Sequence, residues 1–345
     1  MKKHVNIPVF IPHLGCPNMC VFCNQRRISG TVAYSRDDVV KTIEDALATV
    51  MPEQEAQIAF FGGSFTGIDR AEMLYLLEVG YGYVKSGRVR SIRLSTRPDY
   101  IDEEILGILS QYGVKTIELG LQSMSDRVLA ACRRGHTAET AREACRMIKE
   151  RGFELIGQMM IGLPDSTEAD EIYTAREICS LGADGARIYP TVVFLDTELA
   201  DMTARGEYAP LSVEEAVRRS ASALEVFVRD SVRVIRIGLQ ASEALVEGSG
   251  VYEGSEYHEA IGELCYGELF RRRIDAAMAD GDFRGKRVRV SVAPRSISRA
   301  AGLRAANKEY FIKKYGLRDM RISADPKKTE FDFGISFEEG EKICV

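Results

Sequence analysis

Long hydrophobic runs are missing from this 345-residue chain. No stretch approaches the roughly 18 consecutive apolar residues that a membrane-spanning helix needs, so we expect no membrane contact. The N-terminal sequence Met-Lys-Lys-His-Val-Asn-Ile-Pro lacks a continuous apolar segment, which argues against a secretory signal peptide. A framework of paired cysteines is also missing, although the chain contains eight cysteines. This pattern is typical of a reducing compartment, and we expect the cytoplasm.

The chain has no large excess of charge of one sign, but its charge is unevenly distributed. The net charge is −5, whereas Arg284 to Lys328 contains fourteen Lys or Arg against three acids, a local charge of +11. A basic segment on an acidic body is typical of a nucleic-acid-binding surface. The alternative is a solvated face whose cations pair with acidic side chains, and the sequence leaves both interpretations open.

Three thiols are concentrated in one short stretch. Cys16, Cys20 and Cys23 are spaced C-x3-C-x2-C, with the aromatic Phe22 before the last. The other cysteines are single: Cys132, Cys145, Cys179, Cys265 and Cys344. Thiolates are soft ligands that suit an iron–sulfur cluster, and three of them leave one iron of a four-iron cluster open. The alternatives are a zinc loop with His13 as fourth ligand, or three incidental thiols.

The cysteine motif with Phe22 resembles that of the radical S-adenosylmethionine (radical SAM) superfamily. The resemblance implies that the three cysteines hold a 4Fe–4S cluster and that SAM chelates the open iron through its amino and carboxylate groups. One electron, from a reductant such as ferredoxin or flavodoxin, would then release a 5′-deoxyadenosyl radical from SAM.

Strands and helices are predicted to alternate six times before residue 190. The predicted strands are Val5–Ile11, Gln57–Phe61, Ser91–Ser95, Thr116–Gly120, Glu154–Met160 and Gly185–Pro190. A helical pattern follows each of the first five, at the pitch of βα units. Six such units predict an α/β fold, a partial (β/α)6 TIM-like barrel of the radical SAM type, with its chemistry at the C-terminal ends of the strands.

Short motifs follow these predicted strands. Gly62-Gly63-Ser64 allows close backbone approach to a ligand, and the resemblance implies the amino group of SAM. Serine and arginine at a strand tip suit ribose and carboxylate groups. The remaining expected cofactor contacts are Phe22, Ser95, Arg97, Gln122 and Gln158, and the expected substrate contacts are Tyr100, Arg134 and His136.

The runs GGSFTG, STRPDY, IELGLQS, RRGHT and the element ending in MIGLP together resemble the catalytic subunit of Elongator over about residues 5–190. That family modifies the wobble uridine of tRNA with SAM and acetyl-CoA, which implies an RNA substrate. This chain departs from the family in the three-residue gap between Cys16 and Cys20, and in the short stretch after Gly238, which leaves no room for an acetyltransferase domain. A role for acetyl-CoA therefore stays open.

After a core domain over residues 1–240, a basic C-terminal extension is expected over 241–345, with a small α+β fold. Val290–Val292, a helix up to Gly302-Leu-Arg-Ala305, a second helix and Met320–Ile322 follow the rhythm of a KH module. A KH module clamps nucleic acid with a GxxG loop, but here Ala305 replaces the second glycine. We favour an RNA contact, through cations such as Arg295, Arg299, Lys313 and Lys314.

Two other functions remain open. The cysteine spacing fits a small-molecule or tetrapyrrole radical enzyme, such as oxygen-independent coproporphyrinogen oxidase, better than it fits Elongator. A haem or metal carrier that keeps the barrel without the radical reaction is the non-enzymatic alternative.

Overall fold

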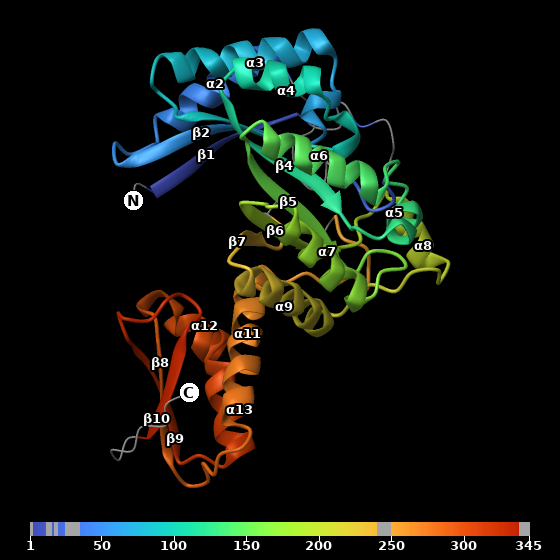
Figure 1. The fold of residues 1–345 in the computed structure, drawn as a ribbon. Coiled ribbons are helices and arrows are strands. Elements are labelled where there is room, and N and C mark those ends of the chain that lie inside the picture. The colour runs from blue at the N-terminus through green and yellow to red at the C-terminus, as the bar shows by residue number, and fades with distance from the viewer. Residues whose placement is uncertain (1–2, 12–15, 17–19, 25–34, 240–249, 338–345) are drawn as a thin grey trace.

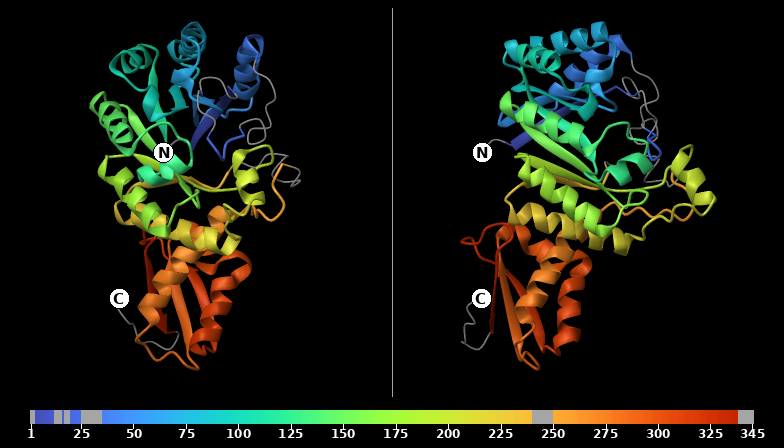
Figure 2. Two further views of the ribbon diagram at one scale, coloured as in Figure 1. Left: turned by 90° about the vertical axis from the view of Figure 1, so that its right-hand side faces the viewer. Right: turned by 45° about the vertical axis from the view of Figure 1, so that its right-hand side comes forward.

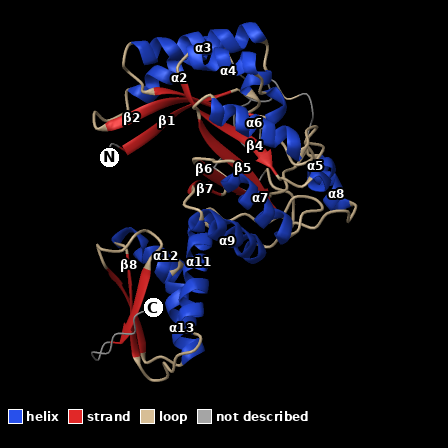
Figure 3. Ribbon diagram, in the orientation of Figure 1, coloured by secondary structure: helices blue, strands red, loops and turns tan. Residues whose placement is uncertain are grey.

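A computed structural model describes residues 3–11, 16, 20–24, 35–239 and 250–337. Its main sheet has seven parallel strands in sequence order (Figures 1 and 3). The strands are β1 (Lys3–Phe10), β2 (Gln54–Phe61), β3 (Ser91–Thr96), β4 (Val114–Gln122), β5 (Glu154–Ile161), β6 (Gly185–Pro190) and β7 (Arg233–Ile237). The sheet curls with its helices on the outer face, which confirms the partial barrel (Figure 2). Strand β7 pairs with β6 and adds a seventh strand to the six expected.

Most connections between strands contain a helix. The helices of this part are α2 (Arg36–Leu47), α3 (Arg70–Lys85), α4 (Glu103–Gln111), α5 (Asp126–Ala131), α6 (Ala138–Glu150), α7 (Glu168–Ser180), α8 (Glu198–Ala204) and α9 (Val213–Arg229), with short 3-10 turns η1 (Phe65–Gly67) and η2 (Pro98–Tyr100). Side-chain caps define several starts, since Asp69 accepts from the backbone of α3 and Thr167 forms a capping box on α7. Helix α8 lies within residues 192–210, a stretch whose sequence pattern predicts no regular element.

The two faces of the sheet differ in chemistry. Ile92 faces α3, because a Cβ added to Gly80 of that helix would lie 2.9 Å from its Cδ1. Gly157 faces α7 in the same way, at 2.7 Å from Ile178. The alternate residues Arg93 and Gln158 therefore point to the inner face. Polar and charged side chains thus line the inside of the barrel, while apolar ones pack under the helices.

A second, smaller sheet forms the C-terminal part, with strand order β10-β8-β9. Its elements are α11 (Ile261–Met278), β8 (Arg287–Val292), η3 (Pro294–Ser296), α12 (Ile297–Ala301), η4 (Leu303–Ala305), α13 (Ala306–Tyr315), β9 (Asp319–Ala324) and β10 (Phe333–Phe337). Strand β8 runs parallel to β9 and antiparallel to β10, which the sequence did not predict. Helices lie on one face of this sheet (Figure 1). No helix in the described ranges is long and apolar enough to cross a membrane.

Candidate functional site

The cysteine stretch lies beside the C-terminal ends of β2, β3 and β4. Cys20 is buried, and Cys16 and Cys23 are half-buried. The Cys16 sulfur lies 3.4 Å from the Ser64 hydroxyl, and the Val21 amide donates to the Cys132 carbonyl at 3.2 Å. Phe22 is buried in an apolar cluster with Val21, Cys132 and Leu163. These contacts tie the cysteine stretch to the mouth of the barrel.

Among the residues that the structure describes, no group of three or more His, Cys, Asp or Glu could hold a metal ion. A zinc site needs four ligands around a single ion, whereas the cysteines of a 4Fe–4S cluster bind different irons. His13 and Cys344 lie outside the described residues.

Two buried guanidinium groups face the Cys20 sulfur. Nη1 of Arg134 lies 3.2 Å from it and Nη1 of Arg97 lies 3.8 Å from it. Arg97 also makes a two-pronged pair with Asp99, at 2.9 and 2.8 Å. Burial alone would raise the pKa of Asp99, but the hydrogen bonds and charge of Arg97 hold this pKa below its usual value. Two buried cations beside this sulfur suit an anionic ligand of a cluster.

The glycine turn after β2 brings the backbone close to the residue that leads into the cysteine stretch. Gly62 has φ of +100°, and a Cβ there would lie 3.2 Å from the Ile11 backbone nitrogen. The Ile11 amide in turn donates to the Phe61 carbonyl at 2.7 Å. Gly62 therefore meets both reasons for glycine at this position, a left-handed backbone and a close approach. The contact of Gly63 and Ser64 with SAM stays a prediction.

The inner face of the barrel contains a polar network that includes two expected cofactor contacts. Gln158 donates to Glu118 at 3.0 Å and lies 3.5 Å from the Ser95 hydroxyl. Arg93 and Arg187 donate to the same Glu118 carboxylate at 2.7 and 3.0 Å. The sequence motifs include Glu118 without giving it a role, and they include neither Arg93 nor Arg187. The charges of these residues at alternate positions of buried strands could have predicted this network, because a buried charge needs a partner.

The side-chain amide of Gln122 has an acceptor atom that forms no hydrogen bond in the described structure. Gln122 lies at a register shift at the end of β4, with φ of +66°. Its Oε1 is buried and has no partner in the described structure. A left-handed backbone at a non-glycine residue is strained and is often found at binding sites. These features fit a ligand contact such as ribose, although the assignment stays a prediction.

The three expected substrate contacts have different surroundings. Arg134 lies under Cys20, as described above. His136 is buried, its Nδ1 lies 3.2 Å from the Thr137 carbonyl oxygen, and its Nε2 has no partner among the described atoms. Burial and the nearby Arg134 charge lower the pKa of His136 to about 4. Tyr100 is half-buried, and its backbone carbonyl accepts from Thr66 at 2.8 Å.

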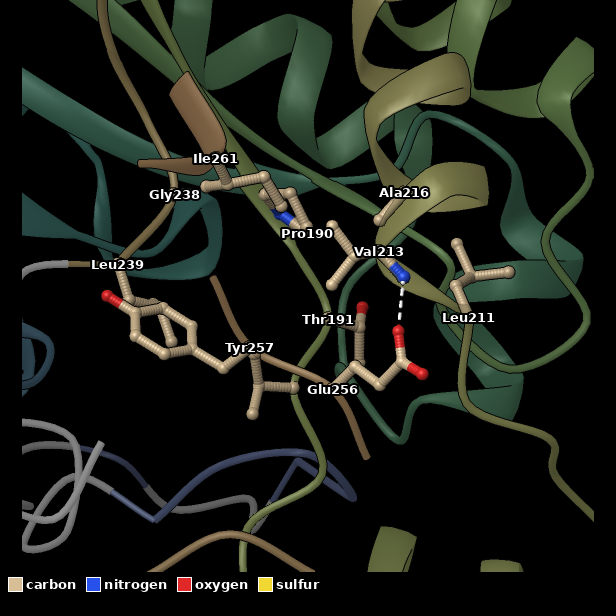
Figure 4. A pocket seen from close by; sticks show the side chains of 11 residues that line it. Pro190, Thr191, Leu211, Val213, Ala216, Gly238, Leu239, Glu256, Tyr257 and Ile261 are labelled. Atoms are coloured by element: carbon tan, nitrogen blue, oxygen red, sulfur yellow. Dashed lines mark hydrogen bonds between the residues drawn. The ribbon is translucent and has the colours of Figure 1, made fainter. Parts of the chain in front are cut away.

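A separate recess lies at the C-terminal ends of β6 and β7 (Figure 4). Pro190 ends β6, and Gly238 directly follows β7 with φ of +88°. The Glu256 carboxylate closes one side by accepting from the Val213 amide at 2.7 Å, at the start of α9. The recess thus belongs to the same end of the barrel as the cysteines, but to the opposite edge of the sheet. The sequence motifs do not indicate this recess.

Family models match most of the chain. Residues 10–178 match the Radical SAM superfamily and residues 183–269 match the Radical_SAM C-terminal domain. The chain belongs to the radical SAM superfamily. It is therefore a radical SAM enzyme, and the cofactors of this family are a 4Fe–4S cluster and SAM. The thiols and the cations around Cys20 fit an anionic, thiolate-bound cluster.

The relatives of this radical SAM protein include proteins named for tRNA uridine(34) and for Elongator. A tRNA uridine(34) acetyltransferase of Methanocaldococcus infernus is 35% identical over 52% of this chain and 33% of its own length. Elongator complex protein 3 of Dictyostelium discoideum is 30% identical over 55% of this chain and 34% of its own length. The chain thus spans about a third of these relatives. An uncharacterised protein of Methanocaldococcus jannaschii is 27% identical over 65% of this chain and 72% of its own length.

Solved structures support the same fold. The Methanocaldococcus infernus Elp3 with an N-terminal deletion superposes with a TM-score of 0.63 at 22% identity, over 79% of this chain and 64% of that one. Methylornithine synthase superposes with a TM-score of 0.50 at 15% identity, over 68% of this chain and 65% of that one. At these identities the similarity shows the radical SAM barrel alone.

Proposed function

We propose that this radical SAM enzyme is Elongator-like and acts on RNA, with tRNA as the substrate class. The observation that carries this proposal is the identity of 30 to 35% to proteins named for tRNA uridine(34) and Elongator, over about half of this chain. The site described above lies within the matched radical SAM segment. We also propose the cytoplasm as the place of this reaction, because the unpaired spacing of the cysteines in the sequence is typical of a reducing compartment.

The residues of the chain would bind and orient the cofactors. Cys16, Cys20 and Cys23 would each hold one iron of the cluster. Phe22 would shield the site from water, since it is buried beside Cys20. A second group, on the tips and inner faces of β2 to β5, would position SAM: Gly62, Gly63, Ser64, Ser95, Arg97, Gln122 and Gln158.

When bound, the cluster and SAM supply a 5′-deoxyadenosyl radical, formed with one electron from a reductant of the ferredoxin or flavodoxin type. The substrate would approach the mouth of the barrel, where Tyr100 and His136 lie beside the Arg97–Asp99 pair. At neutral pH the His136 imidazole is uncharged, because its pKa is lowered to about 4. Its Nδ1–H faces the Thr137 carbonyl oxygen, so its Nε2 would accept a hydrogen bond from the substrate.

Formation of the radical is tested by anaerobic reconstitution with iron and sulfide, followed by SAM and dithionite. We expect 5′-deoxyadenosine from the wild type and none from Cys20→Ala. Cys179→Ala is the matched control, because Cys179 is half-buried on α7 outside the site. Bound cluster without 5′-deoxyadenosine, with tRNA present or absent, would contradict the proposal and favour the carrier.

The basic extension supports contact with RNA, but not through all the cations that the sequence suggested. Arg295 and Arg299 lie 3.1 and 2.6 Å from Glu330, and Lys314 lies 2.7 Å from Asp275. These three charges are compensated within the extension, as the solvated-face alternative expected. Other cations of the basic segment lie on β8 and β9.

The face of the small sheet that is not covered by helices carries arginines. Val288, Val290 and Val292 of β8 are buried toward the helices, whereas Arg287 and Arg289 are exposed on the other side. Arg289 lies opposite Arg321 on β9, which is exposed on the same face. Exposed cations on one face of a sheet suit the phosphate backbone of a nucleic acid.

Binding of tRNA at several salt concentrations tests this surface. We expect Arg321→Gln to weaken binding and to reduce the salt slope by about 0.8, for one lost phosphate contact. Lys314→Gln changes the net charge equally on a cation that pairs with Asp275 and should retain the wild-type slope. Equal effects of the two changes would contradict the sheet face. No retention of tRNA by the wild type at low salt would contradict an RNA substrate and favour a small molecule.

A further inference from the structure

Arg134 is held rigidly between the end of β4 and the cysteine stretch. It follows α5 in a tight turn, in which Arg133 has φ of +53° and the Arg134 amide donates to the Leu129 carbonyl at 3.0 Å. The Arg134 carbonyl accepts a hydrogen bond from Arg97. Only 5% of the residue is exposed, so its guanidinium is excluded from water.

The charge of this guanidinium lacks a carboxylate partner in the described structure. Five arginines are buried there, and the other four each pair with an acid: Arg93 and Arg187 with Glu118, Arg97 with Asp99, and Arg219 with Glu171. Arg134 instead donates to the Gly120 carbonyl at 2.6 Å and to the Cys20 sulfur at 3.2 Å. Its Nε has no acceptor among the described atoms.

A buried, uncompensated guanidinium is strongly destabilising, so proteins pair such groups with anions. Of the two described acceptors of the Arg134 guanidinium, the Cys20 sulfur is the one that can become an anion, and it does so when it ligates iron. Ligation of iron by Cys20 therefore gives Arg134 a counter-ion within hydrogen-bond distance. Hydrogen bonds and positive charge at cluster sulfurs stabilise the added electron and raise the reduction potential.

We propose that Arg134 is a positioning residue for the cluster, which holds the Cys20 thiolate against β4 and raises the reduction potential of the cluster. This role rests on the proposed radical SAM site at Cys16, Cys20 and Cys23, and differs from the substrate contact expected from the sequence. The step it affects is the addition of one electron from the reductant to the cluster, in which no bond breaks.

The test is an anaerobic redox titration of the reconstituted protein without SAM, followed by electron paramagnetic resonance. We expect Arg134→Met to shift the midpoint potential to more negative values and Arg134→Lys to shift it less, since lysine keeps the charge but loses the second hydrogen bond. Arg133→Met is the matched control. Arg133 is the adjacent residue, and its exposed side chain lies 3.7 Å from Glu198.

A wild-type potential in Arg134→Met, at full iron content, would overturn the proposal. If Arg134→Met binds no iron but its apo form keeps the wild-type circular dichroism, the loss of ligation supports the proposal. If the apo form of Arg134→Met is unfolded, the midpoint potential of Arg134→Lys tests the proposal instead. A potential of Arg134→Lys equal to that of wild type and Arg133→Met would then overturn the proposal. Failure of the proposed function is separate, because it appears as a wild type that holds no cluster or forms no 5′-deoxyadenosine.

Discussion

At the scale of single residues, burial decides which chemistry a side chain can perform. His136 is 8% exposed and lies near the charges of Arg134, Arg97 and Asp99. The sequence identifies this histidine as a substrate contact but contains no information on its charge. In the folded protein its pKa is lowered from 6.5 to about 4, first by burial and then by Arg134. His136 is thus neutral over the whole physiological range of pH.

Lowering the pH should destabilise the protein through His136. The unfolded chain binds a proton at this residue below about pH 6.5, whereas the folded chain binds it only near pH 4, so stability falls between these values. We expect wild type to lose about 2 kcal/mol more than His136→Gln between about pH 7.5 and about pH 5, measured by urea unfolding. His4→Gln, at an exposed histidine, is the control and should follow the wild type. Equal losses in wild type and His136→Gln would show that this histidine titrates normally.

At the scale of elements, the turn after β2 connects the sheet with the cysteine stretch. Gly62 combines φ of +100° with a close approach to Ile11. Gly82, within helix α3, has an ordinary helical φ and no atom within 4 Å of a Cβ added there. The same substitution at these two glycines should therefore have opposite effects.

Gly62→Ala should lower the free energy of unfolding by about 1–3 kcal/mol, because alanine is strained in this backbone conformation and its Cβ would press on the Ile11 backbone. Gly82→Ala should raise it by about 0.5–1 kcal/mol, because alanine favours the helix. Urea unfolding measures both. We also expect less iron per chain in reconstituted Gly62→Ala, measured by iron analysis. An unchanged stability and iron content in Gly62→Ala would show that the turn tolerates a side chain.

At the scale of the whole molecule, one helix belongs to two apolar cores. Ile261, Cys265 and Leu269 of α11 are part of the barrel core. Phe270 and Ile274 of the same helix are part of the core under the small sheet. A continuous helix shared in this way should couple the folding of the two cores. We therefore propose that the parts of the chain before and after the boundary at residues 240 and 241 fold together and not as two independent units.

Leu269→Ala and Ile274→Ala test this coupling, because each removes a fully buried side chain from one of the two cores. We expect each change to cost about 2–5 kcal/mol and to shift one common unfolding transition. The chain has no tryptophan, so a single Tyr81→Trp in α3 or Tyr310→Trp in α13 reports on one part alone. Two transitions that respond separately, one to each alanine change, would contradict the coupling.

Local sequence patterns are enough to predict the family and most of the barrel. The spacing of Cys16, Cys20 and Cys23 is a feature of one loop. The alternation of strands and helices follows from the hydrophobic pattern of each segment and from the glycines that end helices. Gly113 and Gly152 each follow a helical pattern in the sequence, and each has a positive φ directly after the C-cap of a helix.

Only the tertiary structure decided which charges meet. The contact between Arg134 and Cys20 joins residues 114 positions apart, and the sequence does not reveal that Arg134 is buried without a carboxylate. The pairing of Arg299 with Glu330 and of Lys314 with Asp275 likewise joins distant segments, so the count of basic residues could not locate an RNA surface. Composition fixes how many charges a chain has, whereas packing fixes which of them lose water and which gain a partner.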